Sequence, residues 1–119
     1  TQSGSAAASD VYKRQGLDIS SIKPNRDMSN LDFMSKILGL SGETGEVSEK
    51  FKKIIRDKKG RLDEDDVAGI VKELGDVLWY VSAISKFLGV DLADVAKGNI
   101  AKLDSRKSRG ELKGSGADR

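Results

Sequence analysis

The sequence predicts an all-α domain built as an antiparallel helical bundle. Three segments of the 119-residue chain carry apolar residues at helical spacing, and residues that begin or end helices bound each one. None reads as a strand, because apolar and polar residues do not alternate there. The connections between the segments are short, which makes neighbouring helices antiparallel.

The N-terminal residues are left out of this prediction. They are small, polar and without period, and AASDVYKRQ (7–15) is the translation of a widely used transposon-sequencing adapter in one reading frame. We therefore expect residues 1–16 to be non-native, with a natural disordered N-terminus as the alternative. Residues 17–30 hold the single proline and several turn formers, which predict a loop. The helical domain is expected over 17–108, and a flexible, glycine-rich basic tail over 109–119.

The first helix is predicted to follow a cap at Ser29 or Asn30 and to end at Gly60. Three glycines lie inside it: Gly39, Gly42 and Gly45. Each costs a helix about 1 kcal/mol relative to alanine. We therefore expect a close helix contact or a ligand near the backbone at these positions.

Two further helices are predicted after this one. The second covers about 64–88, with Asp63 as N-cap and Gly89 as its stop. Its main apolar stripe is Val67, Ile70, Val71, Leu74, Leu78, Val81, Ile84 and Leu88. The third covers about 92–107 after a cap at Asp91, and its stripe is Leu92, Val95, Ala96 and Leu103.

Composition excludes several kinds of chemistry. The chain has no cysteine and no histidine, which removes thiolate and imidazole metal ligands, a cysteine nucleophile and the usual general base. With 21 Lys and Arg against 19 Asp and Glu, no nucleic-acid polymer is expected as a partner. No apolar run reaches membrane-spanning length and nothing resembles a signal peptide, so we expect a cytoplasmic protein without a membrane partner.

Two acidic pairs at i, i+3 spacing occur on the first two helices. They are Glu43 and Glu46 in GETGEVSE, and Glu73 and Asp76 in KELGDVLWY. The second pair continues a second apolar stripe of its helix, where carboxylates are costly unless they are paired or bound to a metal. On the first helix Glu43 lies at the edge of the apolar arc, Glu46 lies farther round, and Glu49 lies nearly opposite.

Four carboxylates in one cleft would repel each other strongly, so a divalent cation is the natural occupant. Ligation by oxygen alone favours Mg²⁺, with Mn²⁺ also possible. Solvated surface acids remain the alternative, because 34% of the residues are charged.

At these residues the sequence resembles the MazG-like, all-α nucleoside triphosphate pyrophosphohydrolases. The family motif, Glu-x-x-Glu followed by Glu-x-x-Asp, stands here as Glu43-x-x-Glu46 and Glu73-x-x-Asp76, and the similarity covers roughly 28–119. The resemblance implies Mg²⁺-dependent hydrolysis of an NTP or dNTP to the monophosphate and pyrophosphate. The four acids would be the metal ligands and catalytic residues, around a water that attacks the α-phosphorus. One of them, or Glu49 through water, would accept the proton.

Substrate contacts are predicted on the first and third helices. Lys53, Arg56 and Lys58 are candidate phosphate contacts, with a solvated basic face as the alternative. Asn99 interrupts the stripe of the third helix and is either a satisfied buried amide or a nucleotide contact, with Lys102 one turn on reaching a phosphate. Trp79 and Tyr80 could stack on a base, but core packing is favoured.

The resemblance also sets expectations for assembly. The family normally has another helix before the motif helix, and that region is missing here or replaced by residues 1–16. Helices that are apolar on two sides need a second surface, so a homodimer or a dimer of dimers is expected. The alternatives are a non-catalytic helical oligomerisation or interaction module, and an enzyme for another phosphorylated metabolite.

Overall fold

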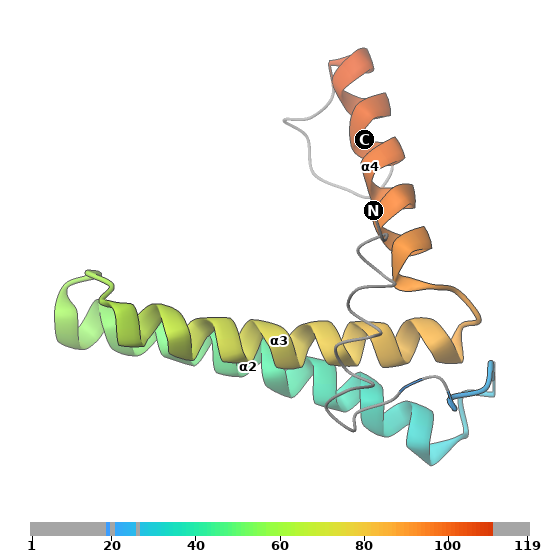
Figure 1. The fold of residues 1–119 in the computed structure, drawn as a ribbon, viewed down its shortest axis with the longest axis horizontal. Coiled ribbons are helices and arrows are strands. Elements are labelled where there is room, and N and C mark those ends of the chain that lie inside the picture. Colours follow the sequence, from blue (N-terminus) through green and yellow to red (C-terminus); the bar gives the residue numbers. More distant parts are fainter. Residues whose placement is uncertain (1–18, 20, 26, 111–119) are drawn as a thin grey trace.

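The computed structural model describes residues 19, 21–25 and 27–110, which contain three α-helices and no strand. Helices α2 (Leu31–Lys58) and α3 (Glu64–Phe87) form a long antiparallel hairpin, and α4 (Leu92–Arg109) leaves the end of α3 and projects away from it (Figure 1). The all-α prediction is confirmed for these residues. The expected non-native segment and most of the expected tail lie outside them.

Side-chain caps fix the starts of the two long helices. Asn30 is the cap of α2, since its Oδ1 accepts a hydrogen bond from the Phe33 backbone N–H at 3.0 Å. Asp63 caps α3 and forms a reciprocal pair with Asp66: each side chain accepts from the other residue's backbone N–H, at 2.8 and 3.0 Å. These local bonds explain why the predicted starts of both helices are correct.

The turn between α2 and α3 is closed by backbone conformation and by one lysine. Lys59 and Gly60 adopt positive φ angles of 54° and 81°, which reverse the chain after α2. The Lys58 ammonium then donates to Asp63 at 2.7 Å and to Asp66 at 2.8 Å. This hydrogen bond from Lys58 holds the pKa of Asp63 below its ordinary value. The turn therefore joins the end of one helix to the cap of the next.

A small core lies where the start of α2 meets the end of α3. The rings of Phe33 and Phe87 stack with centroids 4.7 Å apart, and Phe33 is only 2% exposed. Ile19 and Ala83 are also buried, and the Asn25 backbone N–H donates to the Phe87 carbonyl at 2.7 Å. The segment before α2 is therefore packed against the hairpin.

The two long helices are in close contact at Gly39. A Cβ added there would overlap the ring of Tyr80, whereas at Gly42 and Gly45 it would meet no atom within 4 Å. The expected close helix contact is confirmed for Gly39. At the other two glycines the described residues leave the backbone open.

Much of the predicted main stripe of α3 is not covered by the other described residues. The side of α3 that faces α2 is instead the one that holds Glu73, Tyr80 and Phe87. Four large apolar residues on the neighbouring side are 41–58% exposed: Val67, Val71, Leu74 and Leu78. The stripe of α4 is uncovered too, since none of the residues of that helix is buried. Among the described residues, no helix is both long and apolar enough to cross a membrane.

Candidate metal and substrate site

The hairpin brings three of the four predicted acids together. Carboxylate oxygens of Glu43 on α2 and of Glu73 and Asp76 on α3 all lie within 4.8 Å of one another. Glu43 and Glu73 are half-buried and Asp76 is exposed. We call these three residues the acid cluster.

The register of the two helices explains this meeting. Residues that face each other across the hairpin have numbers that add to 119 or 120: Phe33 with Phe87, Gly39 with Tyr80, and Lys50 with Gly69. The same register sets Glu43 level with Asp76 and Glu46 level with Glu73. Because the acids on each helix are three residues apart, both pairs fall at neighbouring levels of one hairpin.

The electrostatics of the acid cluster favour a cation. Loss of hydration raises the pKa of the Glu43 carboxyl above its ordinary value, and nearby negative charges raise it further: Asp76, then Glu73 and Glu46. Each of these charges disfavours ionisation of Glu43. A positive charge among the carboxylates would relieve that repulsion.

The donor set also fits a hard divalent cation. Mg²⁺ binds oxygen at about 2.0–2.1 Å in octahedral geometry, which sets neighbouring ligand oxygens about 3 Å apart. One carboxylate oxygen from each of Glu43, Glu73 and Asp76 lies within 4.8 Å of the other two. The oxygen donors of the acid cluster are therefore of the kind that Mg²⁺ or Mn²⁺ takes.

The two other glutamates of GETGEVSE are placed differently. Glu46 is exposed and is not part of the three-oxygen group, although its charge acts on Glu43. Glu49 forms an ion pair with Lys52 at 3.1 Å, and the hydrogen bond from Lys52 lowers the pKa of Glu49. The negative charge of Glu49 is therefore already balanced by the ammonium of Lys52.

Lys50 is a residue that the sequence reasoning missed. Its Nζ lies 3.7 Å from Glu73 Oε1, so a cation from α2 reaches the acid cluster. The available signal was its position seven residues after Glu43, which places both on the same face of a helix. Lys50 also lines a pocket between the two helices, toward their joining loop.

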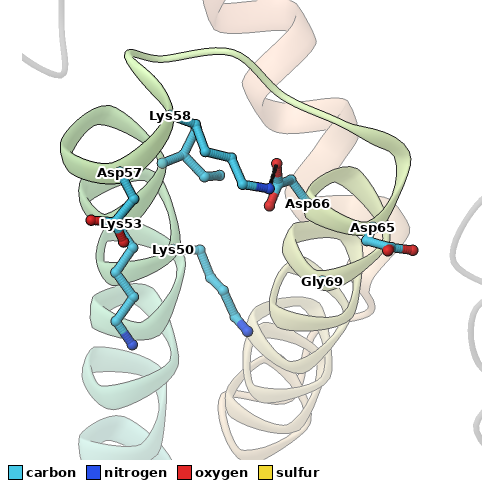
Figure 2. A pocket seen from close by; sticks show the side chains of 8 residues that line it. Lys50, Lys53, Asp57, Lys58, Asp65, Asp66 and Gly69 are labelled. Carbon is cyan, nitrogen blue, oxygen red and sulfur yellow. Dashed lines mark hydrogen bonds and ion pairs between the residues drawn. The ribbon is translucent and has the colours of Figure 1, made fainter.

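That pocket has a volume of about 240 Å³. It is lined by Lys50, Lys53 and Lys58 of α2 and by Asp65, Asp66 and Gly69 of α3, with Ile54 and Asp57. Figure 2 shows the ammonium ends of Lys50 and Lys53 directed away from the loop that joins the helices. The lining of the pocket carries three lysines and three aspartates, and Lys50 links the pocket to the acid cluster.

The part of the chain that carries both acid pairs matches a known domain. Residues 32–110 match the MazG nucleotide pyrophosphohydrolase domain. The chain belongs to this family. It is also 39% identical over 111 residues to the gene 37 protein of Mycobacterium phage L5, a match that covers 92% of this chain and 97% of that protein. No solved structure gives a significant match.

Within this MazG domain, the three predicted phosphate contacts differ in their surroundings. Lys53 lines the pocket, and none of the hydrogen bonds or ion pairs within the described part of the chain involves its ammonium. Lys58 also lines the pocket but donates to two aspartates of the turn. Arg56 donates through two nitrogens to Asp57, at 2.7 and 2.8 Å. Lys53 is therefore the best placed of the three.

The remaining predicted contacts of the MazG domain are not brought to the acid cluster. Asn99 and Lys102 are exposed on α4, which projects away from the hairpin (Figure 1). Asn99 is therefore not the buried amide that one reading of the sequence expected. Trp79 and Tyr80 are half-buried and meet edge to face at 5.0 Å, and Tyr80 fills the space over Gly39. Their packing agrees with the structural role favoured from the sequence.

Proposed function

We propose that this MazG domain hydrolyses a nucleoside triphosphate, NTP or dNTP, to the nucleoside monophosphate and pyrophosphate. The observation that carries the proposal is the acid cluster, in which Glu43, Glu73 and Asp76 converge within the residues that match the family. Phosphoryl chemistry needs concentrated positive charge at the phosphate oxygens, and three convergent carboxylates can recruit a divalent cation that supplies it.

In this proposal Glu43, Glu73 and Asp76 hold Mg²⁺, with Mn²⁺ as a substitute. Glu46 is the fourth ligand, because it is level with Glu73 and its exposed side chain is free to rotate. A divalent cation held there supplies charge neutralisation at the phosphates and acidifies the attacking water.

The protein's other groups bind and orient the substrate. The Lys53 ammonium contacts the β- and γ-phosphates from the pocket and holds the leaving pyrophosphate. The water on the α-phosphorus gives its proton to a carboxylate of the acid cluster or, through a second water, to Glu49. Both routes keep the proton on a carboxylate, since the chain has no histidine.

The test is pyrophosphate release from each NTP and dNTP with Mg²⁺ or with EDTA. Glu43→Gln and Asp76→Asn should each lower the rate by about 100-fold or more, the scale for losing one preorganised electrostatic contact. Without metal, neither variant should be less stable than the wild type, because each removes one of several mutually repelling charges. Circular dichroism melting in EDTA checks this.

Glu64→Gln is the matched control. Glu64 is an exposed glutamate of α3, nine residues or about 13 Å along the helix from Glu73. It should leave the rate unchanged. If no nucleotide yields pyrophosphate, the proposal fails and the interaction-module alternative gains. If both cluster variants stay active, the ligand assignment is wrong.

We also infer that a second copy of the chain covers the exposed stripe of α3. The four residues Val67, Val71, Leu74 and Leu78 follow helical spacing, so they present one continuous apolar strip. A strip of this kind supports a homodimer or a dimer of dimers.

A further inference from the structure

We propose that Lys50 is a resident counter-cation that links metal binding to triphosphate binding. Its ammonium pairs with Glu73 while no divalent cation is bound, and it turns to the polyphosphate when one is. This inference rests on the function proposed above. It assigns a role to a residue outside the acid motif, and that role follows from the position of Lys50 between two parts of the site.

Lys50 and Glu73 form an ion pair without a direct hydrogen bond. The 3.7 Å between Nζ and Oε1 is within ion-pair range and beyond the 2.7–2.9 Å of a charge-assisted hydrogen bond. The Lys50 side chain is 44% exposed, whereas that of Glu73 is 20% exposed. Lys50 is thus the partner that can leave without breaking a direct hydrogen bond.

The path of the side chain places the ammonium between the acid cluster and the pocket. It crosses from α2 to α3 over Gly69, one helical turn before Glu73, and a Cβ added at Gly69 would lie 3.8 Å from Nζ. That distance is an ordinary van der Waals contact, so the ammonium lies directly against the α3 backbone at this turn. Gly69 and Lys50 also line the pocket that holds Lys53. A short rotation therefore moves the charge from the carboxylate to the pocket.

The two positions have opposite effects on the two ligands. Next to Glu73, the ammonium competes with a divalent cation for the same carboxylate. In the pocket, it adds a second positive charge beside Lys53, where the β- and γ-phosphates are proposed to bind. Metal binding therefore releases the charge that triphosphate binding uses, and each ligand must favour the other by the same factor.

The test compares Lys50→Met with Lys52→Met in the full chain. Both variants remove one charge from α2, and Lys52 pairs with Glu49, outside the acid cluster. Mn²⁺ binding without nucleotide is measured by electron paramagnetic resonance. Lys50→Met should bind Mn²⁺ about three- to tenfold more tightly than Lys52→Met, the range for one nearby charge in a water-like dielectric.

The second measurement is binding of the α,β-imido analogue of the fastest-hydrolysed nucleotide, at saturating Mn²⁺. Lys50→Met should bind it about three- to tenfold more weakly than Lys52→Met does. Lys50→Arg keeps the charge and should restore both affinities toward the wild type. Melting curves confirm that all variants fold.

Equal Mn²⁺ affinity in Lys50→Met and Lys52→Met would overturn the role of Lys50, as would weaker Mn²⁺ binding in Lys50→Met. If the wild type releases pyrophosphate and binds Mn²⁺, but Lys50→Met and Lys52→Met bind Mn²⁺ with equal affinity, only this inference fails. If the wild type neither binds Mn²⁺ nor releases pyrophosphate, both proposals fail.

Discussion

Replacing Gly39 with alanine tests the register that assembles the acid cluster. In an open helix, Gly→Ala gains about 1 kcal/mol from helix propensity. At Gly39 the new Cβ would overlap the Tyr80 ring, which is itself packed edge to face on Trp79. Forcing the ring aside costs about 1–3 kcal/mol, the range for overpacking. The net effect of Gly39→Ala on the free energy of unfolding is therefore a loss of about 0–2 kcal/mol.

Gly42→Ala is the matched control, because a Cβ at Gly42 meets no atom within 4 Å. It should gain up to about 1 kcal/mol, so the two variants should differ by about 1–3 kcal/mol. Urea unfolding in EDTA at one protein concentration, followed by circular dichroism at 222 nm, resolves this as a midpoint difference on the order of 1 M.

A third variant identifies the cause of this difference. In a Tyr80→Ala background the overlap is absent, so Gly39→Ala should become stabilising, as Gly42→Ala is. Equal midpoints for Gly39→Ala and Gly42→Ala would refute the close approach. So would an unchanged effect of Gly39→Ala when Tyr80 is removed.

Two further predictions concern the turn and the exposed stripe. The folded-state pKa of Asp63 is lowered, so its carboxylate stabilises the fold above the unfolded value near 3.8, and this contribution is lost as pH falls through the folded-state pKa. Asp63→Asn keeps a good cap but loses the charge, so it should be less stable than the wild type at pH 6. In urea unfolding measured at a series of pH values, its stability should match that of the wild type at the acid end. A stability difference that does not change with pH would contradict this prediction. In sedimentation at fixed concentration, Val71→Lys should shift the chain toward monomer and Leu31→Lys, at the exposed start of α2, should not. A monomeric wild type would refute the assembly.

The helices of the chain were predictable because local chemistry sets their ends. Asn30 and Asp63 cap their helices with their own side chains, and Gly60 takes a conformation that few other residues tolerate. These signals lie within a few residues of the boundaries they fix. Periodicity together with these local signals was therefore sufficient to find all three helices of the described residues.

Burial was less predictable than helix position. Periodicity shows that α3 is apolar around much of its circumference, but it does not say which part meets α2. The structure turns Glu73 and Phe87 toward α2 and leaves Val71 and Leu78 exposed. The choice depends on Phe33 and Tyr80, whose rings fill the hairpin interface from opposite helices. Such matching between distant side chains has no periodic signature, and neither does the direction in which α4 leaves α3.

The acid cluster was partly predictable from the sequence, and the reason lies in the turn between α2 and α3. A hairpin that reverses at Lys59 and Gly60 must set opposite each other residues whose numbers add to about 119, as Gly39 and Tyr80 show. A stop at Gly60 in the sequence therefore already implies that Glu43 is level with Asp76. The turn does not determine how each helix is rotated about its own axis. That rotation is set by packing, and it separates Glu43, which joins the cluster, from Glu46, which is at the right level but exposed. The same rotation points Lys50 at Glu73, so spacing could place Lys50 on the face of Glu43 but only packing determines its pairing with Glu73.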